Sequence, residues 1–221
     1  MQREIITTAD GSKTIQIKDW EEQYHSKHGA VQEAYHVFIK HGLELFKGEN
    51  IRILEIGFGT GLNAFITLLE SKALDLKIEY HGIEAYPVAL HEIKELNYVS
   101  ILKAGAMQAY FDKMHNSSWE EKSNINSNFT LLKLKKFFSD IDDEQLHDLI
   151  YFDAFGARVQ PELWTVEIFQ KMFTALKPGG FLVTYAAKGS VRRAMQEVGL
   201  VVERLPGPPG KREMLRAKRP S

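Results

Sequence analysis

The stretch that decides the fold is IRILEIGFGTGLN, residues Ile51–Asn63. Its apolar first half predicts a buried strand at Arg52–Ile56, and an apolar helical pattern follows the turn. Within the turn, Gly57, Gly59 and Gly61 stand at alternate positions, so the backbone can bend sharply and approach a ligand without a Cβ in the way. This Glu-x-Gly-x-Gly-x-Gly spacing differs from the Gly-x-Gly-x-x-Gly of dinucleotide-binding turns.

The glycine turn resembles the donor loop of S-adenosylmethionine-dependent methyltransferases. An acidic residue agrees with this reading, because Ile78–Ile83 predicts the next strand and Glu84 follows it directly. A carboxylate roughly twenty residues after such a turn is well placed to accept hydrogen bonds from two ribose hydroxyls. The alternative for Glu84 is a solvated charge at a strand end. Together the two features predict S-adenosylmethionine, rather than a nicotinamide, as the cofactor.

Strand and helix patterns alternate on both sides of the turn, which predicts an α/β fold with a parallel sheet between helices. The predicted strands are Arg52–Ile56, Lys77–Ile83, Phe129–Lys136, Asp148–Phe152 and Phe181–Ala186, and the predicted helices are Leu62–Ser71, Val88–Leu96, Ile101–Met114, Val166–Leu176 and Ser190–Val198. A polar loop is expected at Asn116–Asn128. Strands at Leu200–Leu205 and Glu213–Lys218 form a final antiparallel hairpin, the usual ending of a class I methyltransferase sheet.

The first quarter of the chain predicts an extension of this sheet. Residues Glu4–Ile17 read as a β-hairpin, with Asp10-Gly11 as the turn signal. Apolar residues at helical spacing follow in Ala30–Phe46. Because no long linker is evident, we expect a single domain over 1–221, with the hairpin and helix in 1–48 and the donor-binding core in 49–221.

Composition excludes several classes of protein. The chain has 221 residues, no Cys, eight His and a net charge of −1. The absence of Cys excludes disulfides and cysteine nucleophiles, and the His spacings match no common zinc site, so we expect no metal. No segment has the length of a signal peptide core or a membrane span, which predicts a cytoplasmic protein without a membrane partner.

Asp153 is the strongest candidate for catalysis. It follows a buried strand in YFDAFGARVQPELW, and ligands of open α/β sheets bind at this edge. Phe155 and Trp164 would supply an aromatic wall against which a base can stack, and Pro161 starts a helix that shapes the loop between them. The alternative for Asp153 is a helix cap or a turn former.

A basic run closes the chain. Lys211 and Arg212 follow a Pro/Gly loop beside the expected cleft, where they would meet phosphates. The alternative is a solvated charged tail.

These motifs resemble the methyltransferase part of the MnmC-type tRNA wobble-uridine modification enzymes, which also occurs as a stand-alone MnmD-like form. The matching stretches are Tyr24-His25-Ser26, Gly29-Ala30 with Glu33, His36-Val37-Phe38, Leu54–Phe65, Glu84 with Pro87, Phe152–Thr165, Lys177–Gly199 and Lys211–Leu215. They extend over almost the whole chain.

The resemblance implies methylation of the exocyclic amine of 5-aminomethyl-(2-thio)uridine at the tRNA wobble position. Because the chain ends at Ser221, with no flavin-dependent half, we expect the methyl step alone, with other enzymes installing or uncovering the aminomethyl group. Two positions are left open. Asp140 is a candidate acid near the adenine, and Arg158 lies in a loop that differs between family members.

The implied roles can be assigned residue by residue. Asp153 would hold the amine and accept its proton directly or through water, although orientation is the larger role for an ordinary carboxylate. The donor would be held by Gly57, Gly59, Gly61, Asn63, Glu55 at its amino end and Glu84 at its ribose. Phe155, Arg158, Trp164, Lys211 and Arg212 would contact the anticodon stem-loop, with Arg192 and Arg193 as further phosphate contacts.

Three other readings stay open at this point. A small-molecule methyltransferase of the same fold is the first, since a fold does not choose a substrate. A donor- or RNA-binding module without activity is the second. A nicotinamide oxidoreductase is the third, and the glycine spacing argues against it.

Overall fold

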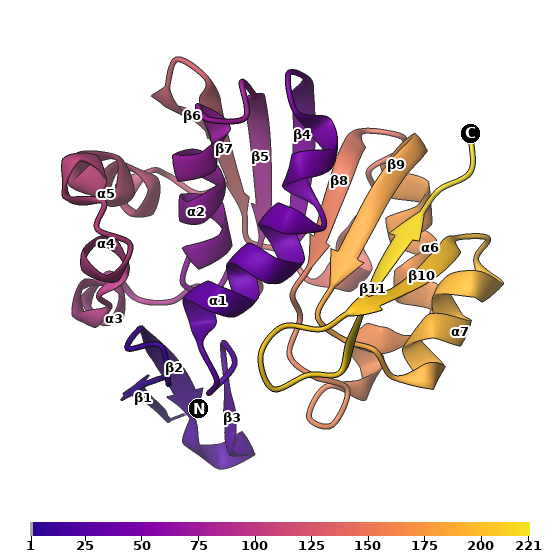
Figure 1. The fold of residues 1–221 in the computed structure, drawn as a ribbon, viewed down its shortest axis with the longest axis horizontal. Helices are drawn as coiled ribbons and strands as arrows, with labels where there is room; N and C mark the ends of the chain where they lie inside the picture. Colours follow the sequence, from indigo (N-terminus) through magenta and orange to yellow (C-terminus); the bar gives the residue numbers. More distant parts are fainter. Residues whose placement is uncertain (1) are drawn as a thin grey trace.

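Within residues 2–221, which this computed structural model describes, the centre of the molecule is an eight-stranded mixed sheet (Figure 1). Its strands, in order across the sheet, are β10 (Val201–Pro206), β11 (Glu213–Lys218), β9 (Leu176–Thr184), β8 (His147–Phe152), β4 (Asn50–Ile56), β5 (Lys77–Ile83), β7 (Phe129–Leu134) and β6 (Lys122–Asn126). The five strands from β9 to β7 run parallel, whereas β6 and β11 pair antiparallel with their neighbours. The predicted parallel sheet with a C-terminal antiparallel hairpin is confirmed.

The central strand β4 is buried on both faces because its side chains alternate between two cores. Ile53 packs into the hydrophobic core on one face of the sheet, and Leu54 packs into the core on the opposite face. Leu149 and Ile150 of the neighbouring strand β8 alternate in the same way, in register with Ile53 and Leu54. A near-continuous apolar run is therefore what this position in a parallel sheet requires.

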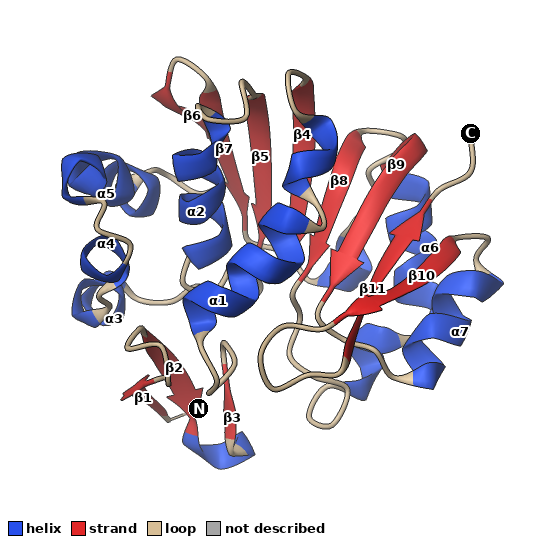
Figure 2. Ribbon diagram, in the orientation of Figure 1, coloured by secondary structure: helices blue, strands red, loops and turns tan. Residues whose placement is uncertain are grey.

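Helices cover both faces of the sheet (Figure 2). One face carries α1 (Ala30–Ala34), which continues as the π-helical η2 (Tyr35–Lys40), then η3 (Leu43–Phe46), α2 (Leu62–Ser71), α3 (Leu90–Glu95), α4 (Tyr98–Ile101), η4 (Gly105–Met107) and α5 (Gln108–Asn116). The other face carries η5 (Phe138–Asp140), η6 (Pro161–Trp164), α6 (Val166–Ala175) and α7 (Gly189–Glu197).

A small separate sheet lies beside the carboxyl ends of the parallel strands (Figure 1). It contains the predicted hairpin, β1 (Arg3–Thr7) and β2 (Lys13–Ile17), and a third short strand, β3 (Glu22–Gln23), that follows η1 (Lys18–Trp20). This placement brings the N-terminal segment over the edge at which ligands of such sheets bind.

Asp10, in the hairpin turn, attaches this small sheet to α1. Its carboxylate accepts hydrogen bonds from the backbone N–H groups of Val31 (3.1 Å) and Gln32 (3.2 Å), at the start of the helix. Burial acts to raise the pKa of Asp10, but hydrogen bonds from Ser12 and Thr8 outweigh burial and lower it. The turn residue thus acts as a helix cap supplied from another part of the chain.

We expect Asp10→Ala to lower the free energy of unfolding by about 1–2 kcal/mol, the usual effect of losing a helix cap. Because the pKa of Asp10 is lowered in the folded protein, this contribution is present above pH about 4 and is lost as the pH falls further. Urea denaturation at neutral pH measures the change. The exposed Asp142 provides the control, and equal losses for Asp10→Ala and Asp142→Ala would contradict the capping role.

Two predicted elements differ from the structure. The polar segment Asn116–Asn128 is not only a loop, because it contains the edge strand β6, which pairs with β7. The helix predicted over Ile101–Met114 is broken into the end of α4, η4 and α5. Both errors have the same cause. Strand pairing and packing determine the structure of these segments, and their polar residues and glycine give no local pattern from which it can be predicted.

Candidate active site

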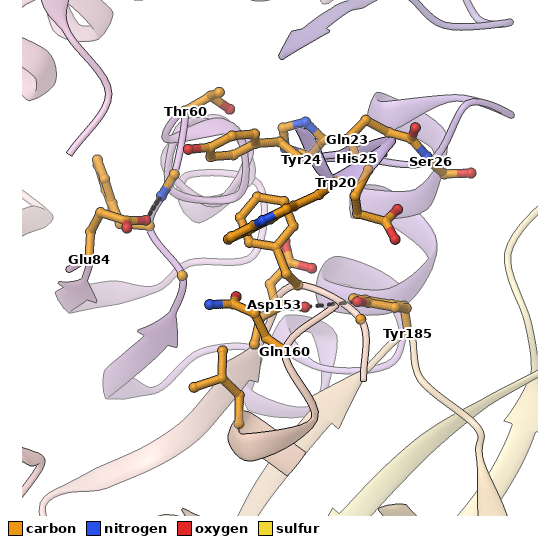
Figure 3. Close-up of a pocket in the computed structure, with 18 of the residues that line it drawn as sticks. Trp20, Gln23, Tyr24, His25, Ser26, Thr60, Glu84, Asp153, Gln160 and Tyr185 are labelled. Atoms are coloured by element: carbon orange, nitrogen blue, oxygen red, sulfur yellow. Dashed lines mark hydrogen bonds between the residues drawn. The ribbon is translucent and has the colours of Figure 1, made fainter. Parts of the chain in front are cut away.

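A cavity of about 740 Å³ opens at the carboxyl edge of the sheet (Figure 3). It lies where the strand order reverses, since the chain leaves β4 for β5 on one side and returns to β8 on the other. Segments that line it include the glycine turn after β4, the loops after β5, β7, β8 and β9, the N-terminal segment around β3, and the loop between β10 and β11. Cavities of this size bind ligands as large as a nucleoside cofactor.

The glycine turn forms one wall of the cavity. Gly57 has φ 91°, and a Cβ there would lie 2.8 Å from the backbone oxygen of Asp153. Gly59 has φ 50° and lines the cavity beside the ring of Tyr24. Gly61 instead lies outside the lining, against Phe58 and His115, where it starts α2. Of the three predicted glycines the structure therefore brings Gly57 and Gly59 to the cavity, while Gly61 permits the turn.

Glu84 points into the cavity from the end of β5 (Figure 3). One carboxylate oxygen accepts the N–H of Gly59 at 3.0 Å, and the other accepts the N–H of Tyr86 at 2.9 Å. Burial raises the pKa of Glu84, and these backbone hydrogen bonds oppose that rise. Because each carboxylate oxygen has a second lone pair, the fixed carboxylate keeps acceptor capacity for two hydroxyl groups.

Glu84→Gln is expected to weaken binding of S-adenosylmethionine about 10- to 100-fold, since a charged hydrogen-bond acceptor contributes about 1.5–3 kcal/mol. Titration calorimetry of the purified protein measures this affinity in the absence of a substrate that accepts the methyl group. The exposed Glu95, which is outside the cavity lining, supplies the matched variant Glu95→Gln. Equal affinities for the two variants would show that Glu84 does not hold the donor.

Asp153 faces the same cavity and is fixed by Asn63. The Asn63 side-chain amide donates to Asp153 Oδ2 at 2.8 Å and to Glu55 Oε1 at 2.9 Å. Glu55 is only 1% exposed and does not line the cavity. Glu55 stands behind the turn and orients the amide that orients Asp153, so its predicted contact with the donor stays a prediction that this arrangement does not support.

The environment of Asp153 favours a proton acceptor that works near neutral pH. Burial, followed by the negative charge of Glu33, raises the pKa of Asp153 to about 7, while Asn63 and Lys211 act to lower it. Burial and the charge of Asp153 also raise the pKa of Glu55 well above its ordinary value. A carboxyl group with a pKa near 7 is a far better general base than an ordinary aspartate.

Phe155 lines the cavity between two aromatic residues of the N-terminal segment. Its ring centroid lies 4.9 Å from that of Tyr24 and 5.6 Å from that of Trp20, in edge-to-face geometry. Trp164 lies elsewhere: it is 6% exposed in the core, and its indole N–H donates to the Phe155 carbonyl at 2.8 Å. Of the two predicted aromatic residues the structure therefore brings only Phe155 to the cavity, beside Trp20 and Tyr24, and Trp164 supports its backbone from the core.

The predicted basic contacts divide into two groups. Lys211 lines the cavity, where its ammonium group is 2.5 Å from the Glu33 carboxylate. Arg212 is exposed on the same loop, outside the cavity lining. Arg158 lies outside it too, and its guanidinium pairs with Glu22 at 3.1 Å, which fastens the N-terminal segment to the β8 loop.

Several cavity residues carried no predicted role. Glu33, Tyr24 and Tyr185 line the cavity, and Tyr185 donates its hydroxyl hydrogen to the Ala154 carbonyl at 2.8 Å. The signal for the first two was the clustering of polar and aromatic residues in the N-terminal segment. Asp140, the open candidate for the adenine, is exposed and outside the cavity lining, whereas its neighbours Phe138 and Ser139 line the cavity. The neighbouring rim is formed by Phe137 and its edge-to-face partner Tyr86.

Over residues 2–221 no group of three or more His, Asp or Glu side chains is arranged to hold a metal ion. The same residues include no helix that is both long and apolar enough to cross a bilayer.

Comparison with known proteins places the chain in a family. Residues 100–220, more than half of the sequence, match the family described as S-adenosyl-L-methionine-dependent methyltransferase. The chain belongs to this family. The cofactor is accordingly S-adenosylmethionine, and the protein is an enzyme. The two alternative hypotheses, a module without activity and a nicotinamide oxidoreductase, are therefore excluded.

Relatives of this methyltransferase agree with the motif resemblance. The protein named tRNA 5-methylaminomethyl-2-thiouridine biosynthesis bifunctional protein MnmC is 26% identical in Hydrogenovibrio crunogenus, over 96% of this chain and 33% of the relative. The protein of the same name in Leptospira borgpetersenii is 28% identical, over 88% of this chain and 32% of the relative. The chain thus spans about a third of the length of these relatives.

A solved structure supports the fold. The crystal structure of MnmC2 from Aquifex aeolicus superposes with a TM-score of 0.72 at 24% identity, covering 100% of this chain and 72% of that one. The predicted class I methyltransferase fold is confirmed.

Proposed function

We propose that this methyltransferase transfers a methyl group to the exocyclic amine of 5-aminomethyl-(2-thio)uridine at the wobble position of tRNA, in the cytoplasm. The observation that carries the proposal is Asp153, a fixed carboxyl group with a pKa raised to about 7 that faces a cavity large enough for a donor and a nucleobase. The MnmC relatives, which match 96% of this chain, supply the substrate class.

The cavity residues suit the donor. Glu84 would hold the ribose hydroxyls through the lone pairs that Gly59 and Tyr86 leave free. The rim pair Tyr86 and Phe137 lies on the same side and offers apolar surface to an adenine ring. Gly57 and Gly59 line the cavity without side chains, which leaves room for the amino acid portion of the donor.

When bound, S-adenosylmethionine supplies an electrophilic methyl group on sulfur. The residues of this chain must then place the amine in line with that group and remove its proton, because an aliphatic amine is mostly ammonium at neutral pH and has no free lone pair. Asp153, held by Asn63 at 2.8 Å, would orient the amine and accept the proton directly or through water. Phe155, with Trp20 and Tyr24 at its edges, would hold the uracil ring.

Phosphate contacts would come from the rim on the side of the C-terminal hairpin. Arg212 precedes β11, and Lys188, Arg192 and Arg193 lie at the start of α7, directly after β9. Because β9 and β11 are adjacent, both segments reach the same end of the sheet. Residues 185–196 contain three cations, Lys188, Arg192 and Arg193, and no Asp or Glu. Arg212 adds a fourth cation from the other segment. Such a surface suits the anticodon stem-loop.

Transfer from labelled S-adenosylmethionine to tRNA carrying 5-aminomethyl-2-thiouridine tests the proposal, with the free nucleoside as competing acceptor. We expect label on the tRNA, with a rate that falls as the salt concentration rises. Faster labelling of the free nucleoside, without salt dependence, would favour the alternative, a methyltransferase of small-molecule amines. A functional link to the enzymes that install or uncover the aminomethyl group belongs to the same proposal.

A further inference from the structure

Lys211 occupies an unusual position for a phosphate contact. Its ammonium group is 2.5 Å from the Glu33 carboxylate and 3.7 Å from the centre of the Tyr185 ring. Glu33 comes from α1 and is 7% exposed, and Tyr185 follows β9. Three separate segments, namely α1, the residue after β9 and the loop between β10 and β11, therefore hold this cation in the cavity that Asp153 also lines, rather than on the outer rim.

The charges around this cation are not balanced. Glu33 and Asp153 both line the cavity, where the Glu33 charge adds to burial in raising the pKa of Asp153, and Lys211 is the cation that opposes this rise. Within residues 2–221, Lys211 forms its ion pair with Glu33, and Asp153 has Asn63, rather than a cation, as its side-chain hydrogen-bond partner. The Asp153 carboxylate is therefore available to accept a proton from an acceptor amine.

We infer that Lys211, held by Glu33 over the ring of Tyr185, is the internal cation of the active site and favours the neutral, reactive form of the acceptor amine. This inference rests on the proposed function for the identity of the acceptor. Lys211 thereby acts as a positioning residue rather than as a phosphate contact, and Arg212 on the same loop keeps the latter role.

The physical reason is repulsion between like charges. A second ammonium group in a cavity that already contains Lys211 is disfavoured, so the acceptor loses a proton more readily than the same amine in water. The proton would pass to the Asp153 carboxylate. The freed nitrogen lone pair would then form the new bond to the methyl carbon as the bond between that carbon and the donor sulfur breaks, and both electrons of the broken bond would remain on the sulfur. Glu33 keeps Lys211 in place and prevents it from forming a direct pair with Asp153, which would remove the base.

Other charged or titratable groups surround this part of the cavity. Tyr185 after β9, Glu22 from β3, and His25 and His28 after β3 line it, whereas Glu55 from β4 and Tyr80 from β5 are buried behind it. Burial lowers the pKa of His25 to about 4, so this histidine is neutral over the range of the test.

The first test is the titration of Asp153 in the protein without acceptor, followed by carbon NMR of labelled Asp side chains and assigned with Asp153→Asn. We expect a midpoint near 7, a higher midpoint in Lys211→Met and a lower midpoint in Glu33→Gln, because these variants remove an attracting and a repelling charge respectively. A midpoint that Lys211→Met leaves unchanged would overturn the inference, whatever the substrate proves to be.

The second test compares Lys211→Met with Arg212→Gln in single-turnover methyl transfer to tRNA. For Lys211→Met we expect the pH of half-maximal rate to rise by about one unit, with the salt dependence unchanged. For Arg212→Gln we expect the opposite pattern, an unchanged pH profile and a salt slope smaller by about 0.9. A reduced salt slope without a pH shift in Lys211→Met would make Lys211 a phosphate contact and overturn the inference.

The variant Glu33→Gln/Lys211→Met serves as the folding control, because removal of both charges leaves no unpaired ion in the cavity. We expect its Asp153 midpoint to lie between those of the two single variants, because the two removed charges act on Asp153 in opposite directions, and its stability to match that of the unaltered protein within about 1 kcal/mol. If the unaltered protein transfers no methyl group to this tRNA, the proposed function fails, and the Asp153 titration still decides the inference.

Discussion

Replacement of Asp153 by Asn is expected to lower the rate of methyl transfer about a hundred- to ten-thousand-fold, the usual contribution of a general base. The substitution preserves shape, and the new amide oxygen can still accept the hydrogen bond from Asn63. It cannot accept a proton from the acceptor. Binding of S-adenosylmethionine should therefore remain, so calorimetry and single-turnover transfer together separate loss of chemistry from loss of the donor.

The rate of methyl transfer is also expected to depend on pH. Because burial and the Glu33 charge raise the pKa of Asp153 to about 7, its carboxylate form is populated above that pH. The rate for the unaltered protein should rise with pH through about 7, and Asp153→Asn should lose this dependence. Asp142→Asn makes the same chemical change at an 87% exposed carboxylate and should leave the profile intact. An Asp153→Asn protein within tenfold of the unaltered rate would exclude the assigned role.

Gly57→Ala is expected to abolish detectable donor binding and to lower the free energy of unfolding by about 2–4 kcal/mol. A Cβ at φ 91° is strained, and here it would lie 2.8 Å from the backbone oxygen of Asp153. Backbone cannot yield as a flexible side chain does, so the ends of β4 and β8 must separate. That movement alters the wall of the cavity and displaces Asp153.

Gly48→Ala is the matched control for this prediction. Gly48 has a similar φ of 82°, but no atom lies within 4 Å of an added Cβ. It should therefore show the backbone strain alone, about 1 kcal/mol, and unchanged donor binding. Thermal unfolding and calorimetry measure both quantities. If the two variants behave alike, the close approach of the turn to Asp153 has no special importance.

The parts of the fold that were predictable from the sequence are those that local pattern determines. The apolar run of β4, the glycine turn and Glu84 lie within one β-α-β unit, and their relative placement follows from the geometry of a parallel sheet. Strand β6 was not predictable in this way. Its sequence, KSNIN in Lys122–Asn126, lacks a strand pattern, and it forms because β7 offers an edge to pair with.

Only those features of the site that depend on a single segment of the chain were predictable from the sequence. Asp153 could be placed at a strand end from the sequence. Its raised pKa, however, depends on burial and on the charge of Glu33, which lies 120 residues earlier in the chain (153 − 33). The same limit explains Trp164, because an aromatic residue near Asp153 in the sequence does not reveal whether it faces the cavity or the core. Lys211 was assigned to phosphate for a similar reason, since its contact with Tyr185 joins two separate loops.

The most direct test of the account is the mass of the wobble nucleoside after one turnover with S-adenosylmethionine. The tRNA should carry either 5-aminomethyl-2-thiouridine or, as a control, 2-thiouridine without the amine. The account predicts that only the first nucleoside gains one methyl group, and that Asp153→Asn does not catalyse this gain. A protein that binds the donor and leaves the aminomethyl nucleoside unchanged, or that methylates both tRNAs alike, would contradict it.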